Sequence, residues 1–130
     1  NQEMIGASAA VDYSDYAINL SGVVGDIGSG QPLYMIINVT TAFTSANSTG
    51  TVVLAVIDEL DATLDSGSVV IVQTAPIVVT ALTAGKTIAI PLPAGLITQQ
   101  YLGLKTTYGV ETVTAGKIDA FIALQPPLNP

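Results

Sequence analysis

Histidine, cysteine, tryptophan and arginine are all absent from this chain of 130 residues. Without Cys the chain forms no disulfides and offers no thiolate ligands for a metal. Without His and Cys it also lacks the usual general base and the usual thiol nucleophile. Its three cationic side chains (Lys86, Lys105 and Lys117) are expected at or within strands, where a Lys ordinarily faces solvent. We therefore expect a protein that is not an enzyme and that uses no cofactor.

Positively charged residues are also scarce in this sequence. Three Lys stand against ten acidic residues, which gives a formal net charge of −7. Proteins bind nucleic acids by neutralising phosphates with basic side chains, and anionic membrane surfaces attract basic segments in the same way. The most apolar stretch, residues 68–82, is interrupted by Gln73, Thr74 and Pro76, so no run reaches transmembrane length. The expected partners include neither nucleic acid nor a membrane.

Charged residues of either sign make up only 10% of the chain, whereas 49% is hydrophobic. Globular domains are usually about one quarter charged. This composition is far too apolar for a disordered chain, and the length is that of one domain. A surface with so few charges favours contact with a partner or with further copies of the chain.

What the sequence has in abundance is short alternating segments separated by turns rich in Gly, Pro, Ser and Thr. Residues 33–39, for example, alternate Leu33, Met35, Ile37 and Val39 with a second set of side chains, as a strand with one buried face does. We find no helical period. The expected strands are residues 32–40, 51–58, 68–75, 77–82, 86–92, 101–104 and 117–124, with a short strand or turn within 12–20 and loops at 41–50 and 106–116.

About eight such strands predict an all-β sandwich or barrel. The residue pattern alone leaves two architectures open. One is an eight-stranded jelly roll, and the other is a seven-stranded immunoglobulin-like sandwich, although the Cys and Trp typical of antibody domains are missing.

The termini are expected to differ from the body of the protein. Residues 1–12 predict an N-terminal arm, residues 13–125 the domain, and residues 126–130 a proline-rich tail. Met4 and Ile5 are the large apolar residues of the arm and are candidates for anchoring it on a neighbouring subunit. Tyrosine is favoured at interfaces because it buries area and keeps a polar group. Further interface candidates are Tyr13, Tyr16 and Tyr34, although the rim of the core explains them equally well.

Two groups of acidic residues raise the question of chemistry. Residues 58–65 are rich in carboxylates, which calcium prefers, but their spacing does not match an EF-hand loop and no Gly occupies the required turn position. We expect a solvated loop there and no metal site. In the C-terminal half the only acids are Glu111 and Asp119. An acidic cleft around either of them is the one enzymatic alternative left open.

Four motifs occur in order along the chain: DYSDYAINL (residues 12–20), GSGQPLYMIINV (28–39), LTAGKTIAIPLPAG (82–95), and YLGL followed by TAGKIDAF (101–104 and 114–121). Together they resemble the jelly-roll capsid cement (decoration) proteins of tailed double-stranded DNA phages, of the Bordetella-phage type. The resemblance implies an all-β, about eight-stranded jelly-roll sandwich with an N-terminal arm.

The resemblance also implies a function. A cement protein binds the outer face of the major capsid protein shell and stabilises the mature head, as a homo-oligomer (dimer or trimer) on the outer surface of the phage head. Strand addition at a sheet edge and the N-terminal arm are two ways to hold the shell. The alternative is a jelly-roll receptor- or carbohydrate-binding module of a phage tail or cell surface. That module predicts an exposed aromatic groove or a metal site, whereas a cement protein predicts apolar or strand-edge contact surfaces and no pocket.

Overall fold

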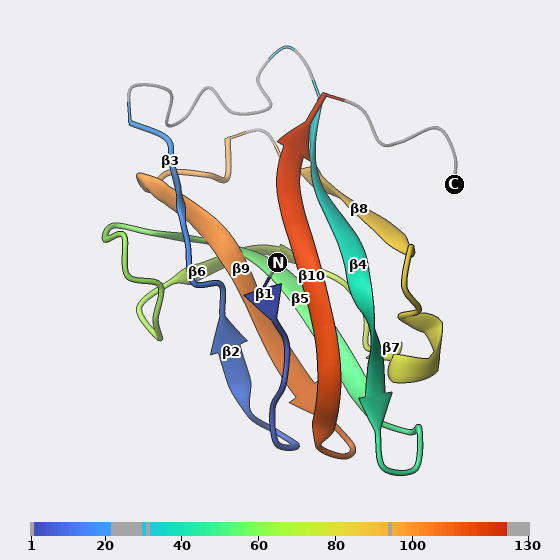
Figure 1. The fold of residues 1–130 in the computed structure, drawn as a ribbon. Coiled ribbons are helices and arrows are strands. Elements are labelled where there is room, and N and C mark those ends of the chain that lie inside the picture. Colours follow the sequence, from blue (N-terminus) through green and yellow to red (C-terminus); the bar gives the residue numbers. More distant parts are fainter. Residues whose placement is uncertain (1, 22–29, 31, 94, 125–130) are drawn as a thin grey trace.

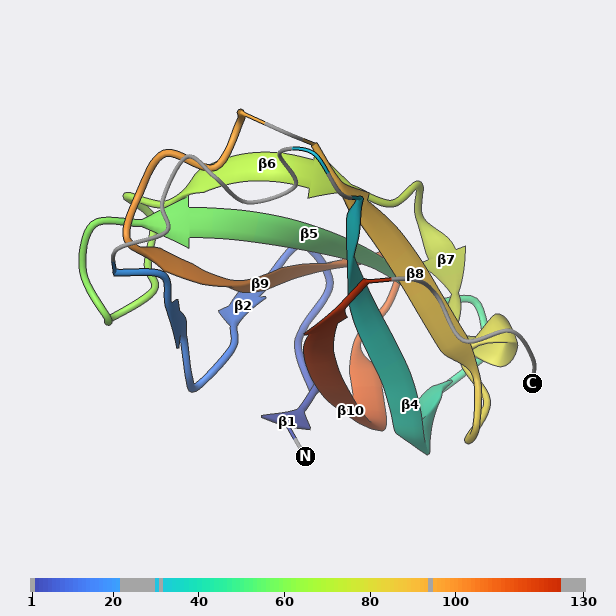
Figure 2. The same cartoon turned by 90° about the horizontal axis from the view of Figure 1, so that it is seen from above.

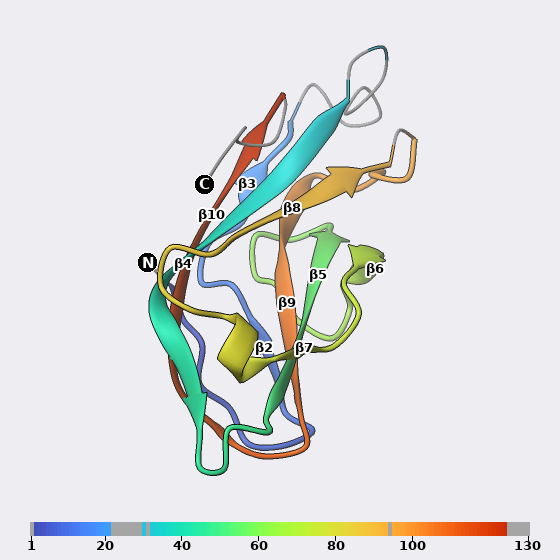
Figure 3. The same cartoon turned by 90° about the vertical axis from the view of Figure 1, so that its right-hand side faces the viewer.

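Two antiparallel β-sheets face each other and enclose the core (Figure 1). The computed structural model describes residues 2–21, 30, 32–93 and 95–124. We call the two layers the β10 sheet and the β9 sheet. Figure 2 shows both layers from above, and Figure 3 shows them edge-on, side by side. The β10 sheet has the order β1 (Gln2–Glu3), β10 (Val113–Ala123), β4 (Leu33–Ser45) and β8 (Thr87–Leu92). The β9 sheet has the order β2 (Val11–Tyr13), β9 (Tyr101–Gly109), β5 (Thr51–Glu59) and β6 (Val69–Gln73).

Two further short strands add to the β9 sheet, in line with β2 and with β6. β3 (Ile18–Asn19) pairs with β9 beyond the end of β2, and β7 (Ile77–Val78) pairs with β5 beyond the end of β6. A single 3-10 turn, η1 (Val79–Ala81), follows β7. Among the described residues no helix is long and apolar enough to cross a membrane.

The pairing order is that of a jelly roll. The first strand pairs with the last, β1 with β10, and the next inward pairs are β2 with β9 and β4 with β8. In the middle of the chain β5 pairs with β6, and the long strands β4 and β5 also pair with β10 and β9. This nesting folds one long antiparallel ribbon over itself into two sheets. The all-β jelly-roll sandwich is therefore confirmed, with eight strand positions and two short extensions.

Alternation within the central strands builds the core. Inward-facing residues of β4, β5 and β9 pack between the sheets because every second side chain of a strand points to the same face. A smaller cluster lies on the outer face of the β9 sheet, where Leu64 from the loop after β5 covers Ala55 and Ile57. The main core includes Met35, Ile37, Val39, Val52, Leu54, Val56, Leu102, Leu104 and Ile118.

Two strands extend further than the sequence pattern predicted. β4 continues to Ser45 through the expected loop at 41–50, and Phe43 within that segment is buried in the core. β9 and β10 occupy most of the expected loop at 106–116, and the connection between them is only residues 110–112. Both segments are rich in Thr, which suits a pleated, half-buried surface as well as it suits a loop. Thr44 and Thr114 illustrate this, since their hydroxyl oxygens lie 2.9 Å apart across the two strands.

The expected N-terminal arm is instead part of the sandwich. Gln2 and Glu3 pair with β10, and the backbone N–H of Met4 donates to the carbonyl of Gly116 at 2.8 Å. The Met4 side chain is 2% exposed and belongs to the core. Residues 2–4 are ordered because their backbone groups pair with the edge of β10 and because the Met4 side chain is buried in the core. The proline-rich tail at 126–130 lies outside the described residues.

Tyr108 fixes the N-terminal segment from the other side. It is the largest fully buried side chain, and its hydroxyl lies 3.4 Å from a carboxylate oxygen of Asp12. Burial, and then the negative charge of Asp12, raise the pKa of Tyr108 well above its usual value of 10. The ring lies so close to Gly6 that a Cβ atom there would sit 2.2 Å from it. Only a glycine lets the chain cross the Tyr108 ring at this distance.

Candidate interaction site at the open side of the sandwich

A cavity of about 400 Å³ lies between the two sheets on the side where β1, β3 and β10 meet. Its floor consists of buried residues from the three strands β4, β9 and β10 and from the segment after β1. Its rim consists mostly of polar or exposed side chains. The floor residues are Met4, Met35, Leu102, Gly103, Leu104 and Ile118, and the rim residues are Gln2, Ser14, Asp15, Tyr16, Ile18, Asp119 and Ala120.

The loop between β2 and β3 forms one side of the rim, and hydrogen bonds hold it in place. The Ser14 hydroxyl accepts the backbone N–H of Leu104 at 3.2 Å and donates to the carbonyl of Tyr16 at 3.1 Å. The backbone N–H of Asp15 donates to the side-chain oxygen of Gln2 at 2.8 Å, which joins this loop to β1. These hydrogen bonds join two of the three separate segments that form the rim, and the third is Asp119 and Ala120 of β10.

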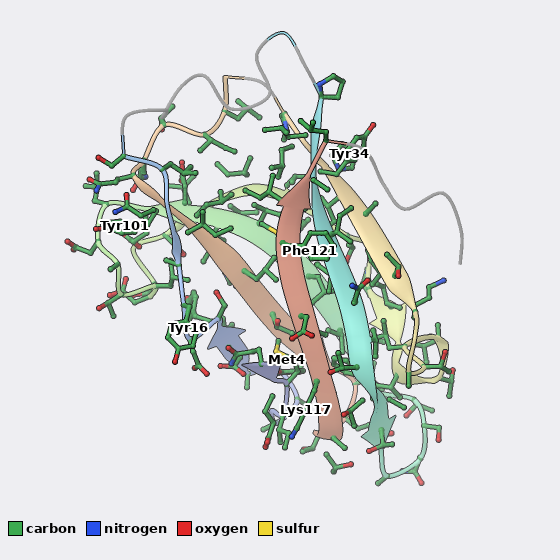
Figure 4. All side chains as sticks on the ribbon, turned by 45° about the horizontal axis from the view of Figure 1, so that its top comes forward. Met4, Tyr16, Tyr34, Tyr101, Lys117 and Phe121 are labelled. Carbon is green, nitrogen blue, oxygen red and sulfur yellow. The ribbon has the colours of Figure 1, made fainter. Side chains whose placement is uncertain are left out.

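Tyr16 is the most prominent side chain on this rim. It is 87% exposed, and Figure 4 shows it pointing away from the strands beside β2. An exposed Tyr at the mouth of an apolar cavity is a ready contact for a partner, because its ring buries a large area at little conformational cost.

The rim is acidic. Asp15 and Asp119 stand on its two sides, and none of the residues lining the cavity is a Lys. The protein as a whole carries a formal net charge of −7. An apolar floor under an acidic rim favours a group with an apolar body and a positive charge over an anion.

The five predicted interface residues do not form one surface. Tyr16 lies on the rim, whereas Met4 lies in the floor and is too buried to anchor an arm on a neighbour. Ile5 is exposed but does not line the cavity. Tyr13 packs beside Leu64 on the outer face of the β9 sheet. Tyr34 is half-buried on β4, close to the end of β10 (Figure 4).

Most of the cavity cannot be predicted from the sequence. Apolar strand residues such as Met35, Leu102 and Ile118 look alike in a sequence whether they fill a core or line an opening in it. Asp119, one of the two acids of the C-terminal half, stands on the rim. Ala120 is the residue from which the cavity could have been predicted, because a small side chain at an inward position of a strand leaves space beside its neighbours.

The acidic segment at 58–65 forms local structural contacts. A carboxylate oxygen of Asp58 accepts the backbone N–H groups of Thr98 and Gln99 at 3.0 and 3.2 Å. Glu59 accepts the N–H of Leu60, and Asp65 accepts the N–H of Gly67. In the part of the chain that the structure describes, no group of three or more acidic side chains is arranged to hold a metal ion. These carboxylates anchor loops.

Glu111 also has a structural role. From the β9–β10 turn it reaches across to the β4–β5 turn, where one oxygen accepts the Ser45 hydroxyl and the backbone N–H groups of Asn47 and Thr49. The other oxygen accepts the side-chain amide of Asn47 at 3.2 Å. These hydrogen bonds, with that from Ser45 the largest contribution, lower the pKa of Glu111 from 4.5 to about 2. All of these donors lie at the end of β4 or in the β4–β5 turn that follows it. The Glu111 carboxylate therefore joins the β9–β10 turn to the β4–β5 turn at one end of the sandwich.

This lowered pKa gives a testable pH dependence. A carboxylate whose pKa falls on folding stabilises the folded state above its ordinary value of 4.5, and that stabilisation is lost as the pH falls through about 2. Glu111→Gln is expected to lower the melting temperature at pH 7, and the difference from the wild type is expected to shrink steadily between pH 5 and pH 2. Thermal denaturation of both proteins across this range measures the effect. A difference that stays constant with pH would contradict the assignment.

A comparison with known protein families finds a match to this chain. The family model Bbp16 matches residues 2–122, which is most of the chain and includes every strand of both sheets except the last residue of β10. No curated protein matches the sequence.

Proposed function

Because the chain belongs to the Bbp16 family, a family of Bordetella phage proteins, we propose that it is a capsid cement protein on the outer surface of the phage head. In this role it binds the major capsid protein of the assembled shell and stabilises the mature head. The observation that carries the proposal is the open side of the sandwich, where an exposed Tyr, an apolar cavity and an acidic rim form one contact surface.

The stabilisation follows from mass action. A protein that binds the assembled shell and not its dissociated subunits stabilises the shell by about 2.7 kcal/mol per site when its free concentration is about 100 times Kd. The shell of a phage head offers many equivalent sites, and a cement protein that also contacts its own copies gains avidity. No catalytic group is needed for this.

Self-association is expected on the flank formed by β6, β7 and β8. Copies with a net charge of −7 repel one another, so they associate most easily where charge is lowest. These three strands contain no charged residue, and Val69, Val70 and Val78 are exposed on them. β6 and β8 are also edge strands, whose backbone groups are available for pairing.

The cavity also favours a second candidate, a receptor- or carbohydrate-binding module, because its volume is within the range of small-molecule sites. A cement protein was expected to have no pocket, so this feature requires explanation. The floor of Met, Leu and Ile side chains has no hydrogen-bonding groups for sugar hydroxyls, and Tyr16 is the only aromatic residue in the lining. An apolar side chain of a protein partner matches this floor better than a sugar does.

The test uses phage heads stripped of their cement protein. The purified protein is expected to co-sediment with them saturably, at a fixed ratio to the major capsid protein, and to raise the melting temperature of the heads. Light scattering beforehand gives its oligomeric state. A well-behaved monomer that binds no head would overturn the proposal, and binding to a glycan array would then support the second candidate.

A further inference from the structure

β10 extends well beyond the residues that pair with its outer neighbour β1. β1 pairs only with Lys117 and Ile118 of β10, whereas β10 continues to Ala123. In the β9 sheet the corresponding edge is longer, because β2 and β3 together extend along β9 from Thr107 to Tyr101. Within the described residues, no strand pairs with residues 120–123 on the side away from β4. Figure 1 shows this part of β10 running upward beyond β1.

The backbone groups at this edge follow from the register. Val39 of β4 donates its N–H to Lys86 and accepts from Gly85, both in the segment before β8. Alternate residues of a strand turn to the same neighbour, so Met35 and Ile37 also face β8 and their neighbours in sequence face β10. Met35 and Ile37 lie opposite Ile122 and Ala120. The N–H and C=O groups of Ala120 and Ile122 therefore point away from β4, toward the open edge.

The cavity lies directly beneath that edge. Ala120 lines it together with Ile118 and Met35, and Ile18 and Tyr16 line its opposite side. A strand added beside residues 120–123 would turn every second side chain toward the inner face of the sheet, because side chains alternate between the two faces. The inward side chain nearest Ala120 would lie over the cavity. The edge supplies hydrogen bonds and the cavity supplies a pocket for an apolar side chain, which are the two parts of recognition by strand addition.

Charge restricts the kind of segment that fits. Asp15 and Asp119 flank the opening and no Lys lines it, so an acidic segment would be repelled and a basic one attracted. A Lys or Arg side chain also has an apolar stem that packs on an apolar floor while its charged end reaches the rim.

We propose that residues 120–123 of β10 accept an extended segment of the major capsid protein as an added strand, with an apolar side chain over the cavity and a Lys or Arg at its rim. The inference rests on the proposed function, and it identifies which surface of this protein meets the shell.

The test places a proline at the open edge. Ala120→Pro removes an N–H group that points away from β4, so it blocks strand addition without breaking the pairing with β4. Val11→Pro is the matched control, because Val11 lies on the edge strand β2, outside the cavity lining, and its N–H points away from β9. Pro91 on β8 shows that the fold accepts a proline at an outward-facing position of an edge strand.

Binding to stripped heads is expected to weaken by about tenfold or more for Ala120→Pro and to stay near the wild-type value for Val11→Pro. Hydrogen exchange on the wild-type protein gives a second measurement that needs no variant. The amides of Ala120 and Ile122 are expected to become protected when the protein binds heads. In the same binding assay, Asp15→Asn is expected to slow association and to reduce its salt dependence, and the charge-conserving Asp15→Glu is expected to do neither.

The outcomes separate this inference from the proposed function. If the wild-type protein binds no heads, the proposed function fails. If it binds, but Ala120→Pro binds equally well and the two amides stay unprotected, cementing stands and the added strand is ruled out. If Ala120→Pro changes the oligomeric state in the absence of heads, the segment on this edge comes from a second copy of the chain, and the assignment to the capsid protein is overturned.

Discussion

Replacing Tyr108 with alanine is expected to lower the free energy of unfolding by about 3–5 kcal/mol, the range typical of large aromatic side chains removed from a core. Tyr108 is 1% exposed and packs in the main core. Its ring also supports the chain at Gly6, so the substitution removes contacts of β9 and of the N-terminal segment together. The residual cavity cannot collapse easily, because β9 is held by pairing with β2 on one side and with β5 on the other.

Urea denaturation followed by circular dichroism measures this loss. Tyr16→Ala is the matched control, because it removes the same side chain from a position that is 87% exposed. Surface substitutions of this kind change stability by no more than about 0.5 kcal/mol. Equal losses for the two variants would show that Tyr108 does not hold the N-terminal segment in place.

The same Tyr16→Ala variant is expected to weaken attachment to phage heads by about 30-fold or more, which corresponds to the loss of about 2 kcal/mol at an interface hot spot. Tyr16 stands at the rim of the cavity with its ring in solvent, so a partner that enters the cavity must cover it. Because the ring makes few contacts within the protein, the loss is expected in binding and not in stability.

Co-sedimentation with stripped heads over a range of protein concentrations gives the dissociation constant. Leu60→Ala is a suitable control, because Leu60 is also highly exposed but lies on the loop after β5, outside the cavity lining. Wild-type affinity for Tyr16→Ala, or an equal loss for Leu60→Ala, would show that the open side of the sandwich is not the surface that meets the shell.

Much of the fold can be predicted from the sequence because the central strands show a clear alternation. Residues 33–39 and 51–58 both reveal their inward faces by alternating apolar residues, and both are strands of the structure. The prediction fails where the residue type suits two structures. Thr-rich segments such as 41–45 and 113–116 suit strands and loops equally, and only pairing across the sheet decides between them.

The N-terminal segment shows a second limit. Met4 is one apolar residue among small and polar ones, and a local pattern of this kind predicts a loose end. What orders it is a partner more than a hundred residues away, since Met4 bonds to Gly116. The cavity is similarly invisible in the sequence, because its floor combines side chains from β4, β9 and β10 that are adjacent only after folding.

The pairing of β1 with β10 has a consequence for the making of the protein. A ribosome delivers residues 2–3 more than a hundred residues before their partners Lys117 and Ile118. β2 likewise waits for β9, so neither sheet is complete until these later strands have been synthesised. Folds dominated by such distant pairings form in about milliseconds to seconds once the whole chain is available. The cavity on the open side of the sandwich, which Ile118 and Ala120 of β10 help to line, therefore forms only after β10 has been synthesised.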